Sequence, residues 1–139
     1  GPPVSFTVVP PASAQTVGST FQVAVMLGNG NDVYSVPLQM QFNPKVLQLV
    51  NVDTGSFLGR DGQAVALVHR DDGDGNVAIS ASRPPGARGV SGAGTVCVLT
   101  FKAKAVGPAA VVVTKPAVRN SEQKAEPATG SRAIVQVQP

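Results

Sequence analysis

The sequence predicts an all-β sandwich, and three observations support this prediction. Leu38–Phe42 alternates strictly between apolar and polar residues, and Thr20–Leu27 repeats large apolar residues at every second position, which is the period of a half-buried strand. Hydrophobic residues make up 42% of the chain but aromatic residues only 4%, so the core must consist mainly of Val, Ala, Leu and Ile, which favour sheets. The 15 Gly and 12 Pro lie between the apolar runs, as expected for short strands joined by turns.

The first third of the chain contains two predicted strands. Val4–Val9 is a short extended run that ends at Pro10-Pro11. The next strand covers Thr20–Leu27, and we expect its inward face to consist of Phe21, Val23, Val25 and Leu27. Residues 28–32, Gly-Asn-Gly-Asn-Asp, tolerate positive φ or bond to their own backbone, so they predict a turn that separates this strand from the next.

The segment Val33–Leu58 contains a strand, a break and a second strand. Leu38, Met40 and Phe42 share one face of the first strand, and Asn43-Pro44 ends it because proline lacks the N–H that a strand ladder needs. A second extended run covers residues 46–52, and residues 53–56 form a turn. Phe57-Leu58 is expected to fold back over the edge of the core.

The second half of the chain predicts a hairpin and three further strands. Ala64–Arg70 and Asn76–Arg83 pair across residues 71–75, with Val77, Ile79 and Ala81 inward. A Pro/Gly-rich loop, Arg83–Gly94, precedes a strand over Thr95–Ala103. Strands are also expected over Ala109–Thr114 and Ala133–Val137, with a polar loop between them that contains a short strand near Val118. No amphipathic helix pattern is present, and the 139 residues are expected to form one domain over residues 1–139.

Charge and hydropathy exclude several functions. The formal net charge is only +3 and the 11 Lys and Arg residues are scattered, so nucleic acid is not an expected partner. No apolar run approaches the roughly 20 residues that a membrane helix needs, and Gly1-Pro2 shows no signal-peptide pattern. The single Cys97 cannot form an internal disulfide. The chain is expected to be a domain of a larger protein.

Two motifs resemble those of a known family. Phe42-Asn43-Pro44-Lys45-Val46-Leu47 matches an aromatic-Asp/Asn-Pro-x-Val-Leu element, and Gly92–Lys104 matches a glycine-rich entry into a strand ending Thr-Phe-Lys. With their order along the chain, from about Val4 to Val137, these motifs resemble the cohesin family. The resemblance implies a nine-stranded antiparallel β-sandwich with jelly-roll topology. It also implies a protein-recognition module that binds dockerins in bacterial cell-surface and extracellular complexes.

The resemblance is closer to one kind of cohesin than to another. In cellulosomal cohesins, the strand before the Asn-Pro break presents an Asn and an Asp two residues apart to the dockerin, and those places fall on Ser35 and Pro37 here. The chain is therefore more similar to non-cellulosomal cohesin-like domains, including those of bacterial surface proteins and secretin-type outer-membrane proteins. This implies an extracellular, cell-surface or periplasmic location at the bacterial outer membrane.

A flat outer sheet face is the predicted binding site. If the strands are adjacent, as the family topology implies, outward residues of low charge form one surface, which is typical of the centre of an interface. The expected partner is a dockerin, a dockerin-like module or a neighbouring domain of the parent protein, and a homo-oligomer could use the same face. The predicted residues are Ser35, Pro37, Gln39, Gln41, Ala78, Ser80, Val96, Val98 and Thr100.

The hairpin turn contains half of a calcium-loop pattern. Asp72, Asp74 and Asn76 place oxygen atoms at alternate positions, as the first half of such a loop does. The sixth position would be Val77 instead of Gly, and the twelfth would be Arg83 instead of Glu. A solvated turn is therefore predicted, with calcium binding as the alternative, and no other cofactor is expected.

The sequence does not predict an enzyme. His69 is the only histidine and has no evident partner, Cys97 is expected to be a buried hydrophobic residue, and the aspartates lie in turns. The function predicted is non-catalytic recognition or tethering in a surface or secretion assembly. A carbohydrate-binding module of similar fold is one alternative, although the chain has no Trp and only Tyr34 outside the Phe set for stacking on sugars. A purely structural spacer is the other.

Overall fold

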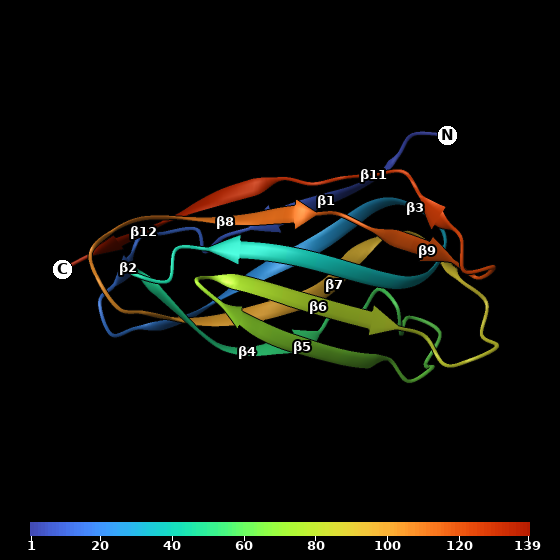
Figure 1. The fold of residues 1–139 in the computed structure, drawn as a ribbon, viewed down its shortest axis with the longest axis horizontal. Coiled ribbons are helices and arrows are strands. Elements are labelled where there is room, and N and C mark those ends of the chain that lie inside the picture. The colour runs from blue at the N-terminus through green and yellow to red at the C-terminus, as the bar shows by residue number, and fades with distance from the viewer.

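The computed structural model describes residues 1–139 and consists of strands, turns and loops (Figure 1). The predicted all-β sandwich is confirmed. The structure contains no helix of the length and apolarity that a membrane crossing requires. The strands are β1 Val4–Val9, β2 Gln15–Thr16, β3 Thr20–Phe42, β4 Leu47–Thr54, β5 Ala66–Gly73, β6 Asn76–Ser82, β7 Val90–Ala103, β8 Gly107–Lys115, β9 Val118–Asn120, β10 Ala125–Glu126, β11 Ala128–Thr129 and β12 Arg132–Gln138.

One long strand, β3, belongs to both layers of the sandwich. Its first half pairs with β1 and β7, and β7 also pairs with β4, which gives one layer in the order β1-β3-β7-β4. Its second half pairs with β6 and β8, which gives the other layer in the order β5-β6-β3-β8-β12. Figure 1 shows β3 bending at one end of the molecule as it passes from one layer to the other. The strands therefore form a single sheet curled into two layers.

The predicted turn over residues 28–32 is wrong as a break, because β3 continues through it. The left-handed conformations that these residue types favour are present at Asn29, with φ 58°, and at Asp32, with φ 52°. They occur where the pairing of β3 with β7 shifts register, between Leu27 and Gly30 and again before Val33. Turn-forming residues here bend a strand instead of ending it.

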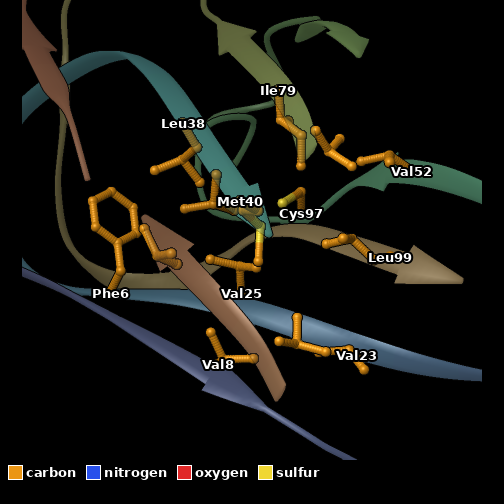
Figure 2. Close-up of a cluster of buried hydrophobic side chains, with 14 of the residues drawn as sticks. Phe6, Val8, Val23, Val25, Leu38, Met40, Val52, Ile79, Cys97 and Leu99 are labelled. Carbon is orange, nitrogen blue, oxygen red and sulfur yellow. The ribbon is translucent and has the colours of Figure 1, made fainter. Parts of the chain in front are cut away.

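The core lies between the two layers (Figure 2). It is a cluster of 32 buried hydrophobic residues. All the predicted inward faces are confirmed, and Phe57 and Leu58 fold over the core edge as expected. The ring of Phe101 lies 5.1 Å from that of Phe42 and 6.0 Å from that of Phe21, measured between centroids, so aromatic contacts join both halves of β3 to β7.

Two element boundaries differ from the predictions. The turn between β5 and β6 contains only Asp74 and Gly75, instead of residues 71–75. Strand β7 begins at Val90 instead of Thr95, because its glycine-rich start pairs with the bend of β3, with Gly92 opposite Gly30. A Cβ atom on Gly30 would lie 2.8 Å from the Gly92 carbonyl oxygen, so this contact requires glycine. The short strand expected near Val118 is β9.

Arg83 joins two loops at the end of the molecule where β3 bends. It is the only charged residue that is buried, with 3% of its surface exposed. Its guanidinium donates to the carbonyl oxygens of Leu58 and Arg88 and to both carboxylate oxygens of Asp61, at 3.0 and 2.6 Å. Every buried side-chain nitrogen and oxygen in the structure has a partner. The pair therefore fixes the loops that follow β4 and β6.

Asp32 holds the bend itself in place. Its carboxylate accepts hydrogen bonds from the Gly89 N–H at 3.0 Å and from the Ser121 hydroxyl at 2.7 Å, and its own N–H donates to Ser91 Oγ at 3.0 Å. The Ser121 hydroxyl, together with the backbone N–H groups, holds the pKa of this carboxyl below its usual range. One side chain thus connects β3 to the segments before β7 and after β9.

Two glycines of the β5–β6 hairpin give a matched test of steric strain. A Cβ on Gly73, with φ 84°, would meet no other atom within 4 Å, whereas a Cβ on Gly75, with φ 80°, would lie 2.0 Å from the Phe42 carbonyl oxygen. We expect Gly73→Ala to destabilise the fold by about 1–2 kcal/mol, the cost of a left-handed conformation. Gly75→Ala should cost more, since it also displaces the end of β3. Urea unfolding measures both values, and equal losses would contradict the close contact at Gly75.

The Asp61–Arg83 pair predicts a pH-dependent contribution to stability. The guanidinium of Arg83 lowers the pKa of Asp61 to about 2, from 3.8. The unfolded chain therefore binds a proton at Asp61 before the folded protein does as pH falls, so the pair stabilises the fold above about pH 4 and this contribution is lost between about pH 4 and 2. The melting temperature of Asp61→Asn should lie below that of the wild type at pH 6, and the gap should shrink toward pH 2. Asp74→Asn, at an exposed turn, is the control and should show no such gap.

Candidate partner-binding face

Six of the nine predicted binding residues lie together on one outer surface. Strand β6 pairs with the second half of β3, so that Gln39 lies opposite Ala78 and Pro37 lies opposite Ser80. Because opposite residues in an antiparallel pair share a face, these side chains form one surface with those of the neighbouring strands. We call this surface the front face; its outward residues are Ala66, Val68 and Arg70 on β5, Ala78, Ser80 and Ser82 on β6, Ser35, Pro37, Gln39 and Gln41 on β3, and Ala110 and Val112 on β8.

The front face is hollowed along β3. A shallow hollow of about 370 Å³ lies over its middle, where the small side chains of Ala78 and Ser80 separate Gln39 from Val68. A second hollow, of about 320 Å³, is lined by Gln41, Val112 and the Asn43-Pro44 break. A third, of about 460 Å³, lies at the other end beside Tyr34 and Ser82. Val68 is 69% exposed at the rim, so the face offers apolar surface as well as shape.

The remaining three predicted residues do not belong to this surface. Val96 is only 2% exposed, because the pairing of β7 shifts register between Cys97 and Thr95 and both Val96 and Cys97 point into the core. Val98 and Thr100 point outward, but β7 pairs with the first half of β3, so they lie on the opposite side of the sandwich. The predicted nine-residue patch is therefore wrong in its β7 part. The local alternation of β7 carries no signal that reveals its neighbour in the sheet.

The opposite side, which we call the back face, is the outer surface of β1, the first half of β3, β7 and β4. Val98 lies opposite Ala24, which lies opposite Val9 on β1. Val9 and Met26 are 39% and 38% exposed. The back face is therefore also partly apolar, and it serves as a natural control surface for tests of the front face.

Sequence patterns did not indicate the contributions of Val68 and Val112 to the front face. Their places follow from pairing: Val68 lies opposite Ser80 across the β5–β6 hairpin, and Val112 lies opposite Gln41. The Asp74-Gly75 turn alone would place Val68 opposite Ala81, but a bulge between Asp71 and Gly73 shifts the pairing by one residue, so that Val68 lies opposite Ser80. The pairing of β8 with β3 joins residues about seventy positions apart, and no local pattern encodes it.

The candidate calcium ligands make other interactions in the hairpin. Asp72 forms an ion pair with Arg70, whose guanidinium lowers the pKa of this carboxyl. Asn76 donates from Nδ2 to the Gly73 carbonyl oxygen at 3.2 Å. The structure contains no group of three or more His, Cys, Asp or Glu side chains that could together hold a metal ion. Asp74, at φ 54°, occupies a turn position that suits Asp and Asn.

His69 and Cys97 lie in quite different surroundings. His69 is exposed on β5 and lines the central hollow of the front face, with no hydrogen-bond partner among the side chains. Cys97 is fully buried, and burial raises the pKa of its thiol to about 12. Because the thiolate is the reactive form of cysteine, this environment suppresses nucleophilic chemistry.

Comparison with known proteins identifies one family. The family model described as the cohesin domain matches residues 6–135. A search of curated proteins found no significant match.

Solved structures show the same fold at low sequence identity. A cohesin module of a family 33 glycoside hydrolase from Clostridium perfringens superposes with a TM-score of 0.83 and 14% identity, over 98% of this chain and 97% of that one. A non-cellulosomal cohesin from the archaeon Archaeoglobus fulgidus gives 0.76 and 19%, over 97% and 92%. A type I cohesin–dockerin complex from Clostridium thermocellum gives 0.74 and 12%, over 97% and 94%. The predicted jelly-roll architecture is thereby confirmed.

The reactivity of Cys97 tests whether this residue is buried in the core. We expect the native protein to react with Ellman's reagent only as fast as it unfolds, because the thiol is both buried and protonated. The urea-unfolded protein should react at once with one equivalent. Ser80→Cys, on the exposed front face, is the matched control and should react rapidly in the native state. Rapid reaction of native wild-type protein would contradict the buried position.

Proposed function

Since this chain belongs to the cohesin family, we propose that it is a non-catalytic module that binds a dockerin or dockerin-like module through its front face. Cohesin domains mediate protein–protein binding, typically to dockerins. The observation that carries the proposal is the outer surface of β3 and β6, which holds six predicted residues. Four of them line a hollow with an exposed valine at its rim. An uncharged centre with apolar area suits the desolvated core of an interface.

The composition of β3 supports a partner unlike the dockerins of cellulosomes. Ser35 and Pro37 occupy the places where the resemblance to cellulosomal cohesins implies Asn and Asp. Neither residue can form the charged or amide contacts of that pair, and the Pro37 side chain offers no hydrogen-bonding group at all. We therefore favour a partner of the non-cellulosomal kind. Two structures of similar fold are a non-cellulosomal cohesin and a module of a glycoside hydrolase.

The proposed setting is a larger protein at the cell surface or in a secretion system. In that setting the module would tether its parent to an assembly, outside the cytoplasm or on the periplasmic side of the outer membrane. The free, fully buried Cys97 is compatible with such oxidising surroundings, because a thiol without an accessible partner forms no disulfide.

Substitutions on the two faces test the proposal directly. We expect Gln39→Arg to weaken binding to a dockerin of the same genome by at least about tenfold, because it places a bulky charge in the centre of the front face. Thr100→Arg adds the same side chain to the back face and should change the dissociation constant by less than about twofold. Isothermal titration calorimetry measures both, and circular dichroism checks that both variants fold.

Two outcomes would contradict the proposal. If Thr100→Arg weakens binding and Gln39→Arg does not, the back face is the binding site. If the folded wild-type protein binds none of the dockerins encoded in its genome, dockerin recognition is wrong. A cellulose pull-down in the same experiment would then test the carbohydrate-binding alternative.

A further inference from the structure

Three cations lie along one flank of the front face without a carboxylate partner. Arg119 on β9 lies opposite Ser35, Lys115 at the end of β8 lies opposite Gln39, and Arg132 on β12 lies opposite Val112. We call these three residues the cationic flank. The ion pairs of the structure are Arg70–Asp72, Arg83–Asp61 and Lys124–Glu122, so none involves the cationic flank. Arg119 donates from Nη1 to the Gln123 carbonyl oxygen at 3.0 Å, which satisfies one of its five donors and leaves its charge unpaired.

The other flank of the front face carries no net charge. On β5 the charge of Arg70 is balanced by Asp72, and the neighbouring outward residue is the exposed Val68. The floor between the flanks consists of uncharged side chains such as Gln39, Ala78 and Ser80. The positive charge of the front face therefore lies on one side only, at the edge opposite β5. The cationic flank carries a charge of the same size as the formal net charge of the whole chain, +3.

The dimensions of the front face fit an α-helix. Strands lie about 4.8 Å apart, so β5 and β8 are separated by roughly 14 Å, and a helix with its side chains is about 10–12 Å wide. Residues Ser35 to Gln41 span about 20 Å along β3, the length of a helix of roughly 13 residues. A helix lying along β3 would have the apolar rim of β5 on one side and the cationic flank on the other.

We propose that the partner helix that lies along the front face carries an acidic row on the side that faces Lys115, Arg119 and Arg132. This inference rests on the proposed function and specifies the chemistry of the partner. An uncharged helix would cover the cationic flank and leave its charges poorly solvated, and a basic helix would repel them. Carboxylates on that side replace the lost water and pair with the cations.

The spacing of the cations defines the pattern of the acidic row. Arg119 and Lys115 lie opposite β3 residues four positions apart, about 13 Å along the strand. A helix rises about 1.5 Å per residue, so about 13 Å corresponds to roughly nine residues. Carboxylates about eight residues apart lie on the same helical side and would meet both cations. The apolar residues of the helix then face Pro37, Ala78 and Val68.

Two stapled helical peptides provide the test. They have the same leucine stripe, and one carries glutamates along one flank where the other carries lysines. Titration of the isotope-labelled protein, followed by NMR, measures the affinity and shows which amides shift. We expect the glutamate peptide to shift amides of β3, β6 and β8 and to bind at least about tenfold more tightly than the lysine peptide at low salt. At about 0.5 M salt this preference should shrink, because charge interactions are screened.

Charge-reversal variants identify the cations responsible. The triple variant Lys115→Glu, Arg119→Glu and Arg132→Glu should reverse the preference between the two peptides. The matched control Lys45→Glu, Arg88→Glu and Lys102→Glu makes the same change in net charge at three exposed positions outside the front face, and should keep the preference for the glutamate peptide.

Several outcomes would overturn the inference. If the two peptides bind the front face with equal affinity, the acidic row is rejected, while the proposed function is unaffected. If an unstructured polyglutamate of the same charge binds as tightly as the glutamate peptide, the cationic flank is a non-specific polyanion site and not part of a helix-binding site. Absence of any shift at millimolar peptide would reject the helix. Loss of dockerin binding altogether is decided separately, by titration of the wild-type protein with dockerins.

Discussion

The passage of β3 from one layer to the other is the constraint on which the rest of the structure depends. The strand must change neighbours without leaving its buried backbone groups unpaired. It does so by bending through Asn29 and Asp32, whose left-handed conformations absorb the change of register against β7. The carboxylate of Asp32 then ties the bend to Gly89 and Ser121. Because β3 belongs to both layers, its bend determines how the two layers face each other.

The same bend separates the two outer surfaces of the molecule. Residues before it, such as Ala24, belong to the back face, and residues after it, such as Gln39, belong to the front face. The inward side chains of both halves meet in one core, so neither half can slip by one residue without burying its polar side chains. A front face positioned by a continuous strand and a packed core is rigid, and a rigid surface loses little conformational entropy when it binds.

Local patterns predicted most strands and their inward faces, but not which strands are neighbours. Alternation placed Leu38 and Ile79 in the core correctly because it depends only on the chain on either side of each residue. The burial of Val96 depends instead on a bulge that forms where β7 meets the bend of β3, and the location of Val98 depends on the half of β3 that β7 pairs with. Both are long-range properties, so the prediction that β7 shares an outer surface with β3 and β6 was wrong.

The cations of the cationic flank differ from Arg83 in their partners. Arg83 is buried and donates hydrogen bonds to the carbonyl oxygens of Leu58 and Arg88, so its role is to stabilise the fold. Removal of its side chain would leave these two oxygens without this donor. Lys115 and Arg132 make no ion pair, so these cations add no such contact to the stability of the fold. A cluster that the folded state does not need is explained most simply by a partner that neutralises it. Because the front face has cations on one side and an apolar rim on the other, we infer that the partner binds in one orientation. Only that orientation brings its acidic side to the cationic flank and its apolar side to the rim of β5.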